Sequence, residues 1–273
     1  MIVRYPSLDL SSASPQWGDN TEAVVVINAG AVIPSEIERY MIQVTRRALP
    51  LLDATSDAAL IDDIQTFNKQ EGQHLKLHAA YLDMLRDGGY PRIREFESGF
   101  AADLNRFLAG ESLEWNLGYC EGFESSGAAM ARAWVDGDVA AVCGDHGSVP
   151  MEMWRWHLAE EFEHRTVVHR VLHRLYGAER AFALRKSGAD FNRGHLAGHS
   201  AQAAAYLHEV NRRGLSEQET ELSVQREQEA WLAIGTCFGA ALGWVYEADY
   251  DPATISPPRD YAATLAAYTP AAA

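Results

Sequence analysis

Residues 71–74 read Glu-Gly-Gln-His and residues 161–164 read Glu-Phe-Glu-His, so the step Glu-x-x-His occurs twice in this chain. Both copies lie in long segments whose apolar spacing predicts helix. Because positions i and i+3 share one face of a helix, each step directs a carboxylate and an imidazole to the same place. Helical bundles that hold two metal ions use this step on two helices and a single Glu on each of two others.

The surroundings of the two steps carry the prediction, because chance alone would give roughly one Glu-x-x-His in such a chain. Both steps have apolar neighbours, and a polar pair within an apolar helix usually points inward. The alternative is a solvent-facing Glu–His pair that stabilises its own helix by a few tenths of a kcal/mol. The apolar neighbours are Phe67, Leu75 and Leu77 for the first step and Trp154, Trp156, Leu158 and Phe162 for the second.

The composition excludes several classes of partner. The net charge of −15 argues against nucleic acid and against anionic membrane surfaces. The sequence has no run of 18 uncharged apolar residues, so we expect no membrane span. The first residues lack the apolar stretch of a signal peptide, and the three cysteines form no Cys-x-x-Cys. We therefore expect a cytoplasmic protein without structural disulfides.

The pattern of apolar residues and helix boundaries predicts an all-α fold. Residues 23–27 (Ala-Val-Val-Val-Ile) could form one short strand or an apolar arm, and Ser35 is a plausible N-cap with Glu38 completing a capping box. We expect an N-terminal arm over 1–33, a helical di-metal domain over 34–250 and a tail over 251–273. The expected helices span about 34–49, 56–87, 92–109, 111–135, 150–176, 178–213 and 216–247.

Single Glu residues on the intervening helices complete the candidate metal site. Four buried carboxylates could not stay ionised together without cations, whereas two divalent ions would neutralise them. Mixed oxygen and nitrogen ligands suit iron(II) or manganese(II). The candidates, in chain order, are Glu36 or Glu38, then Glu71 and His74, then Glu121 with Glu124 three residues on, then Glu161 and His164.

Other histidines leave alternatives open. His78 lies one turn after the first step, and His157 lies one turn before Glu161. Each is either an additional ligand, a donor that orients a carboxylate, or an ordinary buried histidine. Two further i,i+4 pairs could bind zinc, but we interpret them as surface pairs because no third ligand is evident in the sequence. They are His195 with His199, and His169 with His173.

Two segments of the chain resemble a known family. Residues 67–78 (FNKQEGQHLKLH) are similar to F-x-x-Q-E-x-x-H-x-x-x-H, and residues 156–165 (WHLAEEFEHR) to W-H-x-x-E-E-x-E-H-K. These two patterns are the signature segments of the bacterial "predicted metal-dependent hydrolase" family of the ferritin-like di-iron group, which the chain therefore resembles. Residues 34–40 resemble its P-x-G-E-R-F element, and residues 121–124 (EGFE) stand where it has E-H-F-T. The resemblance covers roughly residues 30–180.

The resemblance implies a ferritin-like bundle with additional C-terminal helices, and it favours Glu38 over Glu36. It gives Glu121 the ligand role on its helix, although Gly122 and Glu124 replace the family's His and Thr. The six ligands that it implies are Glu38, Glu71, His74, Glu121, Glu161 and His164. The expected cofactor is two iron ions, with manganese or mixed manganese and iron as options.

Three classes of function compete. The first is a non-haem di-iron oxygenase or oxidase, in which O₂ and a small organic substrate react and Glu38 or Glu121 changes its coordination. Its substrate would lie against aromatic residues such as Trp115, Tyr119, Phe123 and Trp156. An electron donor and a homodimer are further options. The second is a two-metal hydrolase that uses zinc or manganese. The third is non-enzymatic: iron storage or a metal-free interaction module.

Overall fold

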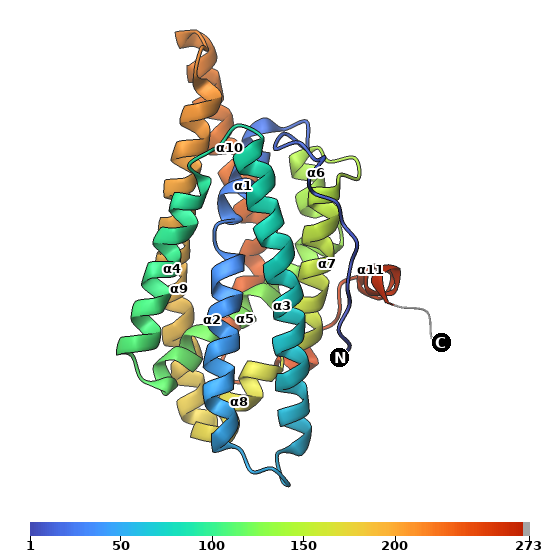
Figure 1. The fold of residues 1–273 in the computed structure, drawn as a ribbon, viewed down its shortest axis with the longest axis vertical. Coiled ribbons are helices and arrows are strands. Elements are labelled where there is room, and N and C mark those ends of the chain that lie inside the picture. Colours follow the sequence, from blue (N-terminus) through green and yellow to red (C-terminus); the bar gives the residue numbers. More distant parts are fainter. Residues whose placement is uncertain (270–273) are drawn as a thin grey trace.

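The computed structural model describes residues 1–269, which form a helical bundle in which no strand occurs (Figure 1). The α-helices are α1 (Thr21–Gly30), α2 (Pro34–Ala48), α3 (Ala58–Asp87), α4 (Ile93–Gly110), α5 (Leu113–Val135), α6 (Asp138–Cys143), α7 (Val149–His164), α8 (Val167–Tyr176), α9 (Ala178–Arg212), α10 (Glu217–Leu242) and α11 (Tyr261–Tyr268). Short 3₁₀ turns lie at Leu49–Leu51, Gly243–Tyr246 and Pro252–Thr254. Within residues 1–269, every helix is too short or too polar for a membrane crossing. The predicted all-α class is confirmed.

The helix predicted over 150–176 is two helices, α7 and α8. The interruption lies at Arg165 and Thr166. The guanidinium of Arg165 donates to the carbonyl of Phe162 and, at 2.7 Å, to the carbonyl of Pro252. The first of these carbonyls lies in the last turn of α7, where the carbonyls lack partners within the helix, so the side chain of Arg165 satisfies one of them.

The apolar run at 23–27, predicted as a strand or an arm, lies in the helix α1. The side chain of Asn20 caps this helix by accepting from the amide of Ala23 at 3.3 Å. The valines at 24–26 are all buried, since α1 packs against α6, α9 and α10. A helix that is buried on every side shows no amphipathic period, which is why the sequence pattern did not reveal it.

The capping box predicted at Ser35 and Glu38 is wrong. Helix α2 begins at Pro34. Proline is favourable at the first helical position, because an amide proton there would have no hydrogen-bond partner within the helix. The hydroxyl of Ser35 donates to Glu97 of α4 at 2.6 Å. Glu38 does not cap the helix, and its side chain is fully buried in the interior of the bundle.

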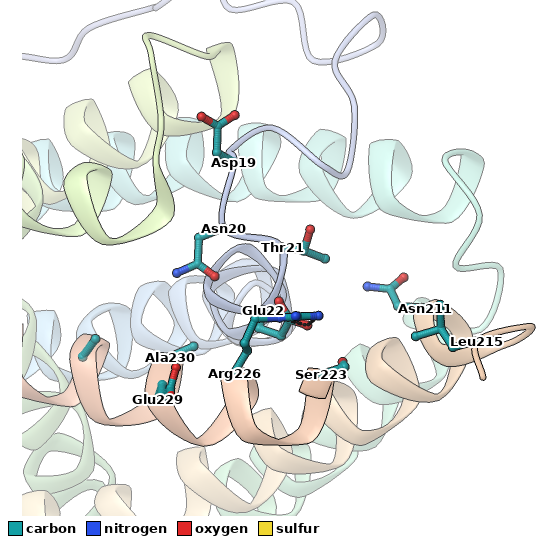
Figure 2. Close-up of a pocket in the computed structure, with 11 residues that line it drawn as sticks. Asp19, Asn20, Thr21, Glu22, Asn211, Leu215, Ser223, Arg226, Glu229 and Ala230 are labelled. Carbon is teal, nitrogen blue, oxygen red and sulfur yellow. Dashed lines mark hydrogen bonds and ion pairs between the residues drawn. The ribbon is translucent and has the colours of Figure 1, made fainter. Parts of the chain in front are cut away.

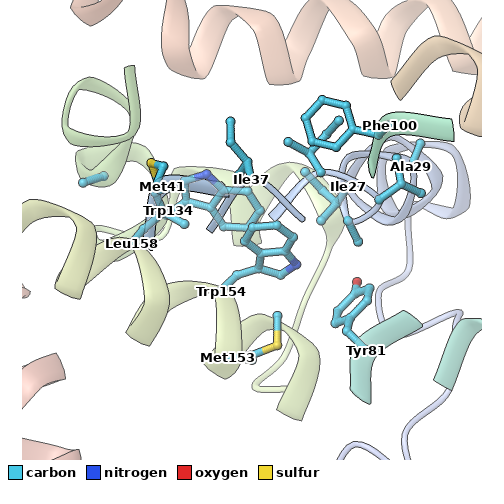
Figure 3. Close-up of a cluster of buried hydrophobic side chains, with 14 of the residues drawn as sticks. Ile27, Ala29, Ile37, Met41, Tyr81, Phe100, Trp134, Met153, Trp154 and Leu158 are labelled. Carbon is cyan, nitrogen blue, oxygen red and sulfur yellow. The ribbon is translucent and has the colours of Figure 1, made fainter. Parts of the chain in front are cut away.

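Four helices, α2, α3, α5 and α7, form the centre of the bundle. Helix α2 contacts α3 and α5, and α7 contacts α3 and α5, so the four helices enclose one interior. The apolar core at one end of this interior includes Ile37 of α2 and Trp154 of α7, whose ring stacks on that of Trp134 of α5 at a centroid distance of 5.0 Å (Figure 3). The N-terminal segment runs along α3 and α7 (Figure 1).

Helices α5 and α9 approach each other closely at glycines. A Cβ atom at Gly122 would collide with the backbone of α9 at Gly188 and Ala189, and one at Gly188 would collide with the backbone at Gly118. The close contact therefore requires glycine at these positions, and it fixes the rotation of α5 in the bundle. It also explains why the His of the resembled family cannot stand at position 122.

We expect Gly188→Ala to destabilise the protein, because the added methyl forces α9 away from α5. The cost should be about 1–3 kcal/mol, as for other overpacked contacts. Gly194→Ala on the same helix is the matched control, since its Cβ would meet open space. The control should raise stability by about 0.5–1 kcal/mol. Chemical denaturation measures both, and equal effects of the two substitutions would contradict the contact.

Candidate metal centre

The four central helices bring seven acidic and histidine side chains together in the interior of the bundle. One group of possible ligand atoms, all within 4.8 Å of one another, comes from Glu38, His74 and His157. A second such group comes from Glu71, Glu124, Glu161 and His164. Every one of the seven side chains is buried. Five of the six predicted ligands are therefore brought together, and Glu121 is not among them.

Two carboxylates of the second group, Glu71 and Glu161, also contact histidines of the first group. Glu161 has Oε1 at 2.9 Å from Nε2 of His157, and its Oε2 is 3.3 Å from Nε2 of His164. Glu71 has Oε1 at 3.7 Å from Nδ1 of His74 and at 3.2 Å from Nε2 of His164. Glu38 and Glu124 lie at opposite ends, at 3.4 Å from His157 and 3.5 Å from His164, respectively. The arrangement resembles two adjacent metal-binding positions that share two carboxylates.

Many polar atoms of the centre have no hydrogen-bond partner within residues 1–269. They are both carboxylate oxygens of Glu38, Glu71 and Glu124, Oε2 of Glu161, Nδ1 of His74 and Nε2 of His164. An unpartnered buried polar group costs free energy comparable to a lost hydrogen bond, and native proteins contain few of them. Their convergence in one place is what a binding site for cations requires.

Electrostatics supports the same interpretation. Burial and the nearby Glu161 hold the pKa values of Glu38, Glu71 and Glu124 well above their usual range. Burial also opposes ionisation of Glu161, but His164 and His157 outweigh it and keep the pKa of Glu161 well below its usual value. Four such carboxylates can be ionised together only beside cations. The oxygen and nitrogen donors therefore fit two divalent ions such as iron or manganese.

His74 is held from behind by an ion pair. Its Nδ1 faces the centre, while its Nε2 is 3.1 Å from Oε2 of Glu160. The other oxygen of Glu160 accepts from Arg4 at 2.9 Å. A carboxylate behind a histidine fixes the tautomer and the ring orientation of a metal ligand.

His164 is held by a parallel chain that ends at the same arginine. Its Nδ1 is 3.2 Å from Oε1 of Gln70, and the amide group of Gln70 donates to Glu163 at 2.7 Å. Glu163 accepts from Arg4 at 2.9 and 3.0 Å. Sequence reasoning missed Arg4, although it is the only Lys or Arg in the first 33 residues of the sequence.

His157 faces the centre and His78 supports it. Nε2 of His157 lies near Glu38 and Glu161, and its Nδ1 is 2.9 Å from Nε2 of His78. Burial lowers the pKa of His157 to about 4 and holds that of His78 well below its usual value. Neutral imidazole is the form that binds metals, so His157 is suited to be an additional ligand.

Glu121 belongs to neither group of ligand atoms and pairs with α8 instead. Its Oε1 is 3.1 Å from Nδ1 of His169 in α8, and Arg185 is a further neighbouring charge. Glu124, one helical turn further along, enters the centre instead. The physical reason is the rotation of α5, which the glycine contact with α9 sets.

An apolar pocket of about 320 Å³ adjoins the centre at His157 and Glu161. Its other lining residues come mainly from α1, α5, α7, α9 and α10, and include Phe123, Met130, Trp134, Trp154 and Phe238. Trp231 also lines the pocket and is 39% exposed, so the pocket reaches the surface there. Of the aromatic residues predicted to meet the substrate, Phe123 lines this pocket. Trp156 packs on the ring of His74 at 4.9 Å instead.

A larger hollow of about 660 Å³ lies apart from the centre, between the start of α1 and α10 (Figure 2). None of the seven side chains of the centre lines it. Two of its charged residues form an ion pair, since Arg226 lies 3.2 Å from Glu22. The pocket at His157 and Glu161 is thus the one connected with the metal centre.

Comparison with protein-family models agrees with the geometry. The model described as "Predicted metal-dependent hydrolase" matches residues 2–255. This span includes Arg4, all seven side chains of the centre and the residues that hydrogen-bond to its histidines. Comparisons with curated proteins and with solved structures found no match. Since the family model covers nearly the whole chain, this protein belongs to the predicted metal-dependent hydrolase family.

Proposed function

We propose that this protein is a non-haem di-iron oxygenase or oxidase that oxidises a small apolar molecule. The observation that carries the proposal is the position of Glu71 and Glu161, which both lie close to His74 of one group of ligand atoms and to His164 of the other. Carboxylates in such positions join the two ions of helical di-metal proteins. A pair of iron(II) ions held there would supply the electrons and the binding site for activation of O₂.

The side chains divide into two coordination positions. Glu38, His74 and His157 would hold one ion, and Glu124 and His164 the other. Glu71 and Glu161 would be shared between them. Manganese, or one ion of each metal, suits the same donors. We assign to Glu124 the role that the resemblance gives to Glu121, because Glu124 reaches His164.

The pocket determines the proposed class of substrate. Its lining is almost entirely apolar, apart from His157, Glu161 and Ser200. A small hydrocarbon-like molecule in the pocket would lie directly against two side chains of the centre, and its apolar walls would exclude water from the reacting groups. We include an electron donor as a further partner, because inserting an oxygen atom from O₂ consumes electrons beyond those of the substrate.

A two-metal hydrolase is the second candidate, and the description of the family favours it. Two adjacent ions, zinc or manganese, can activate a water molecule and stabilise the developing charge. Hydrolysis requires water and polar groups around the scissile bond, whereas the pocket offers mainly aromatic and aliphatic side chains. For that reason we favour oxidation.

We predict that anaerobic protein loaded with iron(II) takes up O₂ after mixing, as measured with an oxygen electrode. Uptake should fall at least tenfold in Glu71→Gln, which keeps the shape of the side chain but weakens its binding to cations. Free iron(II) at the same concentration is the control. If uptake is no faster than this control, while zinc- or manganese-loaded protein hydrolyses esters under argon, the hydrolase is the correct function.

We predict about two iron ions per chain in reconstituted wild-type protein, as measured by elemental analysis. Glu124→Gln should lose at least one of them, because Glu124 faces His164. Glu121→Gln is the matched control on the same helix and should keep both, because Glu121 pairs with His169. The reverse result would return the ligand role to Glu121.

Arg4→Gln should weaken metal binding, since it leaves Glu160 and Glu163 without their shared cation. Loss of such partners costs about 10–100-fold in metal affinity. Breaking a buried pair also costs about 3–5 kcal/mol of stability. Competition with a chelator measures the affinity. Arg86→Gln, at a side chain 42% exposed on α3, should change neither quantity. Unchanged metal affinity in Arg4→Gln would refute the supporting role.

A further inference from the structure

A second cluster of metal-binding side chains lies where α4 meets α9, and no residue of the di-metal centre belongs to it. Asp103 of α4 and His195 and His199 of α9 place one possible ligand atom each within 4.8 Å of the others. The two histidines were interpreted from the sequence as a surface pair without a third ligand. The fold supplies that third ligand, Asp103, from another helix.

Both imidazoles converge on the same carboxylate oxygen. Nε2 of His195 is 3.1 Å from Oδ2 of Asp103, and Nε2 of His199 is 3.0 Å from the same atom. Ligand atoms about 2.0–2.2 Å from a tetrahedral ion lie about 3.3–3.6 Å from each other. Each nitrogen therefore needs to move only a few tenths of an ångström from Oδ2 of Asp103 to accept an ion between them.

Two further polar atoms of the cluster have partners that orient it. Nδ1 of His195 is 2.8 Å from the hydroxyl of Tyr119 on α5. Oδ1 of Asp103 accepts from Arg106 at 2.8 Å, so Oδ2 is the oxygen that faces the histidines. A hydrogen-bond partner on the second nitrogen of a histidine is typical of metal ligands.

Aromatic packing restricts both rings. The ring of Phe100, which is fully buried, lies 5.2 Å from that of His195 and 5.1 Å from that of His199. Phe107 and Phe191 pack on His195 at 5.4 and 5.6 Å. The ligand positions are thus largely formed in advance, which lowers the entropic cost of binding an ion.

The side chains of this cluster are themselves partly exposed, whereas those of the di-metal centre are buried. The side chains of Asp103, His195 and His199 are 24%, 11% and 15% exposed, respectively. An ion bound there would keep at least one coordination position open to water. With two nitrogen donors and one oxygen donor, the cluster suits a cation of intermediate softness, such as Zn²⁺, better than the carboxylate-rich centre does.

We propose that Asp103, His195 and His199 form a separate zinc site that links α4 to α9. In the zinc-free state both Nε2 atoms donate their protons to Asp103. On binding, Nε2 of each histidine coordinates Zn²⁺ and its proton moves to Nδ1, where that of His195 donates to the oxygen of Tyr119. The site is independent of the proposed oxidation chemistry.

The test is equilibrium dialysis of the full chain, first loaded with iron, against ZnCl₂. We expect wild-type protein to bind about one zinc ion more than Asp103→Asn or His199→Ala. The affinity of either variant for zinc should be at least tenfold lower than that of wild type. Tyr119→Phe, which removes only the partner of His195, should bind about tenfold more weakly. His146→Ala, at a side chain 81% exposed and paired with Asp19, is the control and should match wild type.

Asp103→Asn keeps the shape of the side chain, so a thermal melt without zinc checks that this variant folds. Zinc should raise the melting temperature of wild-type protein and leave that of Asp103→Asn unchanged. Equal zinc content in wild type and both ligand variants would overturn the proposal. A zinc-edge anomalous map without a peak between Asp103 and His199 would do so as well.

Discussion

Four carboxylates buried in one helical interior are the constraint on which the rest of the structure depends. Glu38, Glu71, Glu124 and Glu161 come from four different helices, and their unpartnered oxygens converge. Burial together with mutual repulsion makes such a group costly unless protons or cations neutralise it. The family to which the chain belongs is metal-dependent by description, and the bundle supplies the donors that two divalent ions need. Metal binding and folding should therefore be strongly coupled in this protein.

The surrounding structure holds these donors in place at two levels. Apolar contacts such as the stacked pair Trp134 and Trp154 position the helices. The second level is polar and comes from a distant part of the chain, because Arg4 supports His74 through Glu160 and His164 through Gln70 and Glu163. The N-terminal segment is thus part of the metal centre, although it precedes the first helix.

The sequence predicted those parts of the site that depend on residues close together in the chain. Helical periodicity suffices to place Glu71 beside His74 and Glu161 beside His164, so the two Glu-x-x-His steps could be predicted with their helices. The choice between Glu121 and Glu124 depends on the rotation of α5, which the contact of Gly122 with α9 sets and no local pattern reports. Arg4 and the cluster at Asp103 involve residues far apart in the sequence. Helix α1 was missed because its valines are buried on all sides and show no period.

The most direct test of the central claim is an iron-edge anomalous diffraction map from crystals of iron-loaded protein. The account predicts two peaks per chain about 3.5–4 Å apart, the usual separation in two-metal sites. Glu71 and Glu161 should lie between them, with Glu38, His74 and His157 at one peak and Glu124 and His164 at the other. A single peak, or a second peak bound by Glu121, would contradict the account.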